Sequence, residues 1–265
     1  MSIYNDPTLK EALAGISICR AFKGLLLYFF EYFRWIMSVI AANLQAVKND
    51  IAAAAQHAGR APADVTLLAV SKTVSADRIR EAFDAGQRAF GENYVQEGVE
   101  KIATLDALRG QIQWHFIGPL QSNKTRPVAE QFDWVHAIDR LKIAERLSAQ
   151  RPAGLPPLQV CLQVNISNED TKSGVAPAEV PALAQAIAAL PNLQLRGLMA
   201  IPAPAADPAA QRQPFAALRA LLDQLRQSGL NVDTLSMGMS ADMDAAIAEG
   251  ATLVRIGTAI FGARS

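Results

Sequence analysis

Short apolar runs alternate with amphipathic helical patterns along most of this chain. The first run, Val65–Val70, follows a helical pattern from about Ile40 to Ala58 that stops at Gly59, where a helix-ending glycine is expected. Seven further runs follow, and a strand buried on both faces has this continuous apolar character. The eight predicted strands are Val65–Val70, Arg88–Phe90, Ile112–Ile117, Trp134–Ala137, Leu158–Val164, Gln194–Ala200, Thr234–Ser236 and Thr252–Ile256.

Helical patterns separate these runs. Beyond the first helix they cover Ser75–Ala85, Tyr94–Leu108, Leu141–Ala149, Pro177–Leu190, Pro214–Ser228 and Ala241–Glu249. Parallel strands need crossover connections, so this alternation indicates βαβ units around a parallel sheet. Eight strands favour closure into a single (β/α)8 TIM barrel, an α/β fold. The alternative is an open doubly wound sheet, which the absence of a GxGxxG pattern after the first strand disfavours.

The first 36 residues stand outside this alternation. Their apolar and aromatic stretch, Ile16–Ile36, is interrupted by Arg20, Lys23, Glu31 and Arg34, whereas a membrane-spanning helix needs about 20 mostly apolar residues. No small-residue cleavage site follows the apolar run, as a secretory signal would require. We therefore divide the chain into an N-terminal helical extension, residues 1–36, and a barrel domain, residues 37–265.

Three interpretations of the extension remain open. An ordinary amphipathic helix begins close to Met37, which favours an over-early start codon as the origin of the residues before it. The alternatives are an appended helix outside the core and a helix that binds a membrane surface or a partner.

Composition narrows the functional classes. The chain has 25 basic and 25 acidic residues and a formal net charge of zero, which argues against a general binder of nucleic acid. Its two cysteines, Cys19 and Cys161, lie far apart without the spacing of a metal site or a nearby partner. We expect no metal, no membrane insertion and a reduced, cytoplasmic protein.

Polar residues follow most of the predicted strands, where TIM barrels carry their active sites. Among them, Lys72 follows an unbroken apolar strand and would enter a partly desolvated cavity, where its amine can attack a carbonyl group and form an imine. The alternative is a lysine that only extends its charge to solvent at a strand end. The residues after the strands are Ser71-Lys72-Thr73, Gly91-Glu92-Asn93, Gly118, Asn165, Ile201-Pro202, Gly238-Met239-Ser240 and Gly257-Thr258.

The last two strands add a candidate phosphate site, because phosphate in these barrels often lies on the loops after strands seven and eight. The segments Ser236–Met243 and Arg255–Thr258 supply hydroxyl, backbone and guanidinium donors there. An imine-forming lysine that faces a phosphate site indicates pyridoxal 5′-phosphate. Ser240 could instead only cap a helix, Gly257 only permit a turn, and Arg255 only form an ion pair at the barrel bottom.

Several motifs resemble the YggS/PROSC family of pyridoxal phosphate homeostasis proteins over about residues 38–264. The resemblance is specific because the motifs occur together and in the expected order. They are Ala69–Thr73, Phe90–Glu97, Trp114–Lys124, Asn165-Ile166-Ser167 with Lys172-Ser173-Gly174, Gly197–Met199, Ser236–Ser240 and Arg255–Thr258.

The resemblance implies a barrel like the N-terminal domain of alanine racemase with pyridoxal 5′-phosphate bound to Lys72 as a Schiff base. It implies that Arg255 faces the pyridine nitrogen and that Asn93 lies near the ring. The phosphate would lie on Ser240, Gly257 and Thr258, and Ser236 joins the cofactor-binding residues through the same motif. A cation opposite the pyridine nitrogen makes the ring a weaker electron sink, so carbanion chemistry is poorly supported.

The family's role implies a protein that stores pyridoxal phosphate and passes it to apoenzymes without evident catalysis, and we expect a monomer. The alternative is an amino-acid racemase or lyase. Such racemases carry a second, β-rich domain with a tyrosine base, whereas this chain ends at Ser265, soon after the eighth strand. His115 and His136 could replace that base, but isolated histidines near strands are more often structural. A lysine aldolase on the same barrel would not explain the family's loop motifs.

The segment from Gln121 to Arg126 could be a basic docking surface for client enzymes or a second cofactor contact. A solvated polar loop that opens a helix explains the same residues, and no role is assigned to them.

Overall fold

The strands of this protein close into a barrel in a computed structural model that describes residues 38–167, 169 and 173–263. Eight parallel strands follow one another around the ring in chain order, and the last pairs with the first. All eight predicted strands are present, and the (β/α)8 fold is confirmed. Their bounds are β1 Thr66–Val70, β2 Ala89–Glu92, β3 Gln113–Phe116, β4 Trp134–Ile138, β5 Leu158–Gln163, β6 Leu193–Met199, β7 Thr234–Ser236 and β8 Leu253–Ile256. The predicted extension, residues 1–36, lies outside the described residues, as does Cys19.

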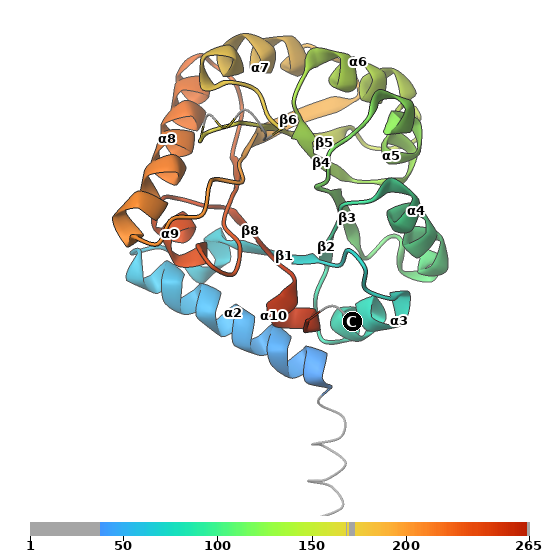
Figure 1. The fold of residues 1–265 in the computed structure, drawn as a ribbon. Coiled ribbons are helices and arrows are strands. Elements are labelled where there is room, and N and C mark those ends of the chain that lie inside the picture. The colour runs from blue at the N-terminus through green and yellow to red at the C-terminus, as the bar shows by residue number, and fades with distance from the viewer. Residues whose placement is uncertain (1–37, 168, 170–172, 264–265) are drawn as a thin grey trace, which may run out of the picture.

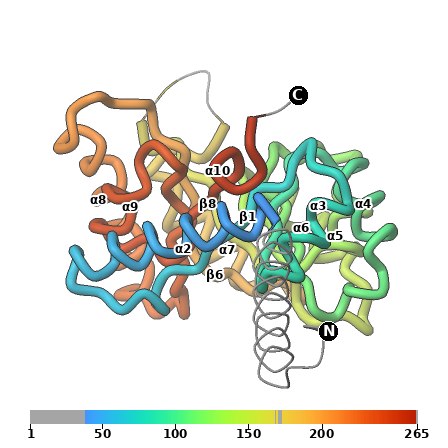
Figure 2. Tube along the Cα trace, turned by 90° about the horizontal axis from the view of Figure 1, so that it is seen from below, coloured from blue at the N-terminus to red at the C-terminus, as the bar shows by residue number. Residues whose placement is uncertain are grey.

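Helices form an outer ring around these strands (Figure 1). The first described helix, α2, lies along the outside of β8 and β1 and packs against α9 and α10 (Figures 1 and 2). The α-helices are α2 Val39–His57, α3 Ala76–Asp84, α4 Val95–Thr104, α5 Thr125–Gln131, α6 Leu141–Gln150, α7 Val180–Ala188, α8 Pro208–Gln227, α9 Met243–Ala248 and α10 Thr258–Phe261. Short 3₁₀ turns are η2 Pro62–Asp64, η3 Asp106–Leu108, η4 Ser122–Lys124 and η5 Pro177–Glu179.

Two predicted helix starts were wrong. The helix expected from Pro214 begins at Pro208, because the Asp207 carboxylate accepts the backbone N–H of Ala210 and caps an earlier turn. The helix expected from Ala241 begins at Met243. A turn precedes it in which Asp242 Oδ1 accepts the N–H of Met239 at 2.6 Å, so Ser240 is not its N-cap.

The core has two parts because side chains alternate between the two faces of each strand. Leu67 and Ala69 pack outward in the large cluster that joins strands to helices. Leu68 packs inward with Ala89 and Leu253. The barrel is therefore filled by side chains, and the free cysteine, Cys161, is buried in a second inward cluster. Burial raises the pKa of the Cys161 thiol to about 12, which makes it unreactive.

Among the described helices, none is both long and apolar enough to cross a membrane.

Candidate functional site

The C-terminal mouth of the barrel holds Lys72, which follows β1 and is half-buried. The strand leads to it through the inward-facing Leu68 and the half-buried Val70. Leu68 pairs with Arg255 on the neighbouring strand β8. Lys72 therefore follows the strand that pairs with β8, four residues further toward the mouth than Leu68, the partner of Arg255.

A buried ionic cluster holds the residue before Lys72. Ser71 Oγ donates to Glu92 Oε1 at 2.6 Å, and its carbonyl oxygen accepts from Lys101 Nζ at 2.6 Å. Lys101, on α4, also contacts Glu92 Oε1 at 2.9 Å and Glu97 Oε1 at 2.5 Å. Glu92 is fully buried and Lys101 is nearly so. We name Glu92, Glu97 and Lys101 the lysine clamp.

The same clamp holds the residue after Lys72. The backbone N–H of Thr73 donates to Glu97 Oε1 at 2.5 Å. Thr73 has a φ of 63°, in the left-handed region that a β-branched residue rarely adopts and that costs of order 1–3 kcal/mol. The clamp thus fixes both neighbours of Lys72 and offsets the strain at Thr73.

Burial dominates the electrostatics of the clamp. Desolvation raises the pKa of Glu92, and the nearby Lys101 cation and the Ser71 hydroxyl partly oppose that rise. Sequence reasoning placed Glu92 after the second strand and Glu97 in a family motif, but it missed Lys101 and the contacts that join the three residues. The spacing of four between Glu97 and Lys101 is a signal of a helical ion pair, but it does not show that the pair turns inward.

Asn93 follows β2 at the same mouth. Its Oδ1 atom is buried and has no hydrogen-bond partner among the described residues. Its carbonyl oxygen lies against Gly118, where a Cβ atom would stand only 2.1 Å from that oxygen. Gly118 therefore permits the close approach of the two loops that places Asn93. The Oδ1 atom of Asn93 is a buried acceptor that a ligand can use.

Arg255 is buried inside the barrel and anchored on three acceptors. Its Nη1 donates to the carbonyl oxygen and to Oγ of Ser236, at 2.5 and 2.8 Å, and its Nη2 donates to Ala200 O at 2.8 Å. Burial lowers the pKa of Arg255 to about 10, so the guanidinium keeps its charge at neutral pH. The structure thus joins the predicted residues Arg255 and Ser236.

Gly257 and Thr258 come directly after β8 and begin the short helix α10. A Cβ atom on Gly257 would lie 3.0 Å from the carbonyl oxygen of Val70, so the backbone of this loop touches the strand that leads to Lys72. Thr258 is exposed. The structure therefore brings Gly257 beside Val70, two residues before Lys72, and Thr258 is the next residue along the chain.

Ser240 has different surroundings. It is exposed between β7 and α9 and lines two surface cavities whose other walls come from α2, α8 and α9. None of those wall residues is Lys72, Asn93, Arg255 or Gly257. A role for Ser240 in phosphate binding stays a prediction.

Two histidines that were expected to be structural lie in the barrel interior and connect to Ser236. His136 Nδ1 is 2.8 Å from Ser236 Oγ, and His136 Nε2 is 2.9 Å from His115 Nδ1. Burial lowers the pKa of His115 to about 3. Burial, His115 and the Arg255 cation lower the pKa of His136 well below its ordinary value. Both rings are neutral at physiological pH.

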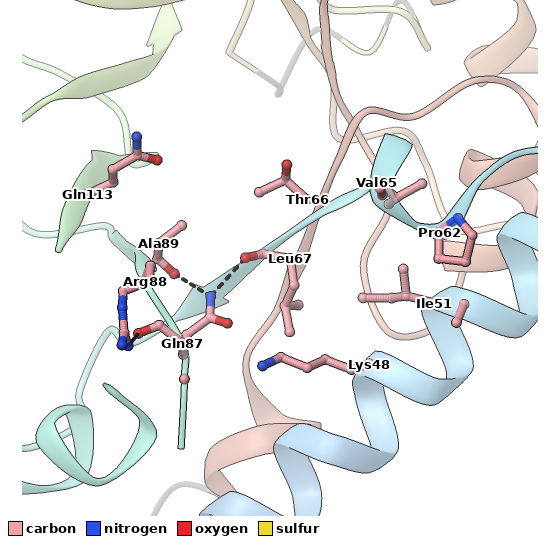
Figure 3. Close-up of a pocket in the computed structure, with 13 residues that line it drawn as sticks. Lys48, Ile51, Pro62, Val65, Thr66, Leu67, Gln87, Arg88, Ala89 and Gln113 are labelled. Atoms are coloured by element: carbon pink, nitrogen blue, oxygen red, sulfur yellow. Dashed lines mark hydrogen bonds between the residues drawn. The ribbon is translucent and has the colours of Figure 1, made fainter. Parts of the chain in front are cut away.

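A cavity of about 490 Å³ lies at the opposite end of the barrel, between α2 and the first residues of β1 and β2 (Figure 3). It contains none of the predicted cofactor residues. The amide of Gln87 donates to Leu67 O and Ala89 O, each at 2.8 Å, and Arg88 donates to Phe83 O and Gln87 O. Its polar side chains therefore already hold strand and helix ends together, which is a structural role.

The residues at the mouth fit pyridoxal phosphate. Lys72 provides an amine for the aldehyde, Arg255 a charged guanidinium for the ring, and Gly257 backbone for the phosphate. The unpartnered Oδ1 atom of Asn93 is an acceptor for the ligand.

Comparisons with known proteins agree with this arrangement. The model of the family described as alanine racemase, N-terminal domain, matches residues 42–265. A pyridoxal phosphate homeostasis protein of Pseudomonas aeruginosa is 64% identical over 228 residues, which are 86% of this chain and 97% of that protein. Its namesake in Escherichia coli is 58% identical over 229 residues, 86% of this chain and 98% of the relative.

Solved structures show the same fold. PipY of Synechococcus elongatus with pyridoxal phosphate bound is 40% identical, with a TM-score of 0.74 over 84% of this chain and all of that one. Alanine racemase of Corynebacterium glutamicum matches with a TM-score of 0.61 and 17% identity, over 84% of this chain and 60% of that enzyme. The second likeness concerns the fold alone.

Proposed function

Because the chain belongs to the family of pyridoxal phosphate homeostasis proteins, built on the alanine racemase N-terminal domain, we propose that it binds pyridoxal 5′-phosphate on Lys72 and supplies it to apoenzymes. The observation that carries the proposal is that Lys72 follows β1 at the barrel mouth while Arg255 lies on the paired strand β8. An amine at the mouth and a buried cation deeper in the barrel suit the two ends of the cofactor's ring.

Each residue has a distinct part in this proposal. When bound, pyridoxal phosphate supplies an aldehyde that condenses reversibly with amines. Lys72 provides the amine, and Asn93 Oδ1 provides an acceptor beside the ring. Gly257 and Thr258 offer backbone N–H groups and a hydroxyl to the phosphate, because the first turn of a helix leaves its N–H groups unpaired. Ser236 and Ser240 complete the predicted set.

Arg255 favours storage over turnover. A guanidinium beside the pyridine nitrogen disfavours protonation there, which weakens the ring as an electron sink. Arg255 keeps its charge because its own pKa of about 10 lies well above neutral pH. With this charge, Arg255 would make the site poor at stabilising a carbanion, and Lys72 would hold the cofactor through its amine until another amine displaced it.

A transfer experiment tests this function. The protein is loaded with pyridoxal phosphate, freed of excess cofactor and mixed with the apoform of a pyridoxal phosphate enzyme, whose regained activity is followed. We expect reactivation by the loaded protein, none by a Lys72→Ala variant treated alike, and no racemisation or loss of added amino acids by the protein itself. Failure of the loaded protein to reactivate, or steady amino-acid turnover, would refute the carrier function.

Three further expectations belong to the same proposal. Delivery to apoenzymes requires contact with client proteins, and the monomeric state predicted from the sequence would leave the barrel mouth accessible to them. The cytoplasmic location rests on two cysteines without a partner nearby in sequence, of which Cys161 is buried and free.

A further inference from the structure

A continuous chain of hydrogen bonds crosses the inside of the barrel from β8 to β3. It runs from Arg255 Nη1 to Ser236 Oγ at 2.8 Å, on to His136 Nδ1 at 2.8 Å, and from His136 Nε2 to His115 Nδ1 at 2.9 Å. All four side chains are at most 5% exposed. We call this the interior chain.

We propose that the interior chain has one fixed direction, with every donor pointing away from Arg255, and that His136 and His115 are positioning residues for that guanidinium. In this arrangement both rings carry their hydrogen on Nε2. The inference about the rings stands on the geometry alone, whereas its meaning for the cofactor rests on the proposed function.

The count of hydrogens supports this direction. An arginine side chain only donates, so Ser236 Oγ accepts from Arg255 and keeps a single hydrogen of its own. Among the described residues, the other hydrogen-bond neighbour of that oxygen is His136 Nδ1, which becomes the acceptor of the hydroxyl hydrogen. His136 then carries its hydrogen on Nε2 and donates to Nδ1 of His115. The reverse direction would leave the Ser236 hydroxyl hydrogen buried without an acceptor beside the Arg255 cation, whereas the proposed direction leaves its one unpaired donor on His115 Nε2, at the end of the chain far from Arg255.

Electrostatics favours the same direction. With the donors pointing away from Arg255, the lone pairs of Ser236 and His136 face the cation, and the N–H dipoles are aligned with its field. In the low-dielectric interior such an aligned chain strengthens each of its bonds. Reversal would direct two N–H groups toward a buried positive charge.

The end of the interior chain at His115 lies beside a further cavity. His115 Nε2 is buried and has no partner among the described protein atoms. His115 also lines a cavity of about 250 Å³ at the N-terminal ends of the strands, with Thr66, Gln113, Trp134 and Thr234 among its other walls. This volume and its polar walls suit ordered water, which takes about 30 Å³ per molecule. The proposed direction therefore ends on the His115 N–H beside this cavity, at the end of the chain far from Arg255.

The direction matters for the cofactor because it points the Ser236 hydroxyl hydrogen at His136 and leaves the Oγ lone pairs to Arg255. Together with Ser236 O and Ala200 O, this oxygen fixes the plane of the guanidinium. Loss of His136 would leave the Ser236 hydroxyl hydrogen without its acceptor, and the hydroxyl would turn. Arg255 would then lose one of three anchors while keeping its charge.

Nitrogen-15 NMR on ligand-free protein with labelled histidine tests the direction. The chain has three histidines, and the exposed His57 supplies a reference ring in the same spectrum. Signals are assigned with His57→Gln and His136→Asn variants. We expect both buried rings to carry hydrogen on Nε2 and none on Nδ1. Hydrogen on Nδ1 of either ring would overturn the inference, whether or not the cofactor binds.

Binding of pyridoxal phosphate tests the positioning role. A His136→Phe variant removes the acceptor of Ser236 at similar volume and should weaken the affinity about tenfold. His136→Asn can place an oxygen near the former Nδ1 and should regain most of the affinity. Ser148→Ala, which removes another buried hydroxyl on the outer helix α6, is the matched control.

The outcomes separate this inference from the proposed function. Unchanged affinity in His136→Phe, or an equal loss in Ser148→Ala, would overturn the positioning role. If the wild-type protein does not bind the cofactor at all, the proposed function fails and with it the positioning role, and the direction of the chain is still decided by the NMR result.

Discussion

The Nζ atom of Lys101 lies 2.6 Å from the carbonyl oxygen of Ser71, the residue that precedes Lys72 in the chain. The same ammonium contacts Glu97, which holds the residue after Lys72 through the Thr73 N–H. A lysine on α4 thereby fixes the backbone on both sides of the lysine proposed to bind the cofactor.

A Lys101→Met variant should therefore lose stability. It would leave Glu92 as a fully buried carboxylate without its cation, at a cost of about 3–5 kcal/mol in the free energy of unfolding. Urea unfolding at pH 7 measures this loss. The matched control is Lys142→Met, at an exposed position on α6, which should stay within about 0.5 kcal/mol of wild type. Equal stability of the two variants would show that the clamp is not formed.

Gly118 should not tolerate a side chain. A Cβ atom there would stand 2.1 Å from the carbonyl oxygen of Asn93, so a Gly118→Ala variant must displace the loop after β2. We expect a loss of at least about 1–3 kcal/mol and weaker binding of pyridoxal phosphate, since Asn93 moves. Gly110→Ala is the control, because nothing lies within 4 Å of its Cβ position. Thermal unfolding and cofactor titration of both variants decide the matter, and similar values for the two would contradict the contact.

Acid should destabilise the fold through His115 and His136. Burial lowers the pKa of both in the folded state, to about 3 for His115, whereas the unfolded chain binds protons near pH 6.5. Their contribution is complete above pH 6.5 and is lost as the pH falls toward 3, at about 1.4 kcal/mol per pH unit for each ring. Glu92 acts in the opposite direction, because its raised pKa favours the folded state at low pH.

Denaturant unfolding between pH 7 and pH 4 measures this dependence. A His115→Gln variant should show a smaller decline of stability with falling pH than wild type. His57→Gln, at an exposed position on α2, should follow the wild-type curve. A parallel decline in His115→Gln and wild type would contradict neutral burial of that ring.

The fold could be predicted because strands buried on both faces leave a continuous apolar signal. All eight strands were predicted. The polar residues that follow the first apolar run made Lys72 a candidate. Helix starts were harder to predict. The helix predicted to begin at Pro214 begins at Pro208, because Asp207 caps an earlier turn. α10 was not predicted, because only four residues form it.

The candidate site was predictable only where the chain itself carries the signal. Lys101 and His136 reach the site through contacts across the barrel, and such contacts have no periodicity in the sequence. Ser236 and Arg255, predicted through the family motifs, are joined by hydrogen bonds, whereas Ser240 faces cavities beside α2 and α8. The lysine clamp combines a helical pair with a strand residue nine positions away, which the packing of α4 against β2 brings together.

The central claim is that Lys72 binds pyridoxal phosphate as a Schiff base, and borohydride trapping tests it most directly. The protein is incubated with the cofactor, reduced, digested and analysed by mass spectrometry, beside a Lys72→Ala variant and the Lys142→Met control. We expect the reduced adduct on Lys72 in wild type and in Lys142→Met, and its absence in Lys72→Ala. An adduct spread over surface lysines, or one that persists in Lys72→Ala at wild-type yield, would contradict the account.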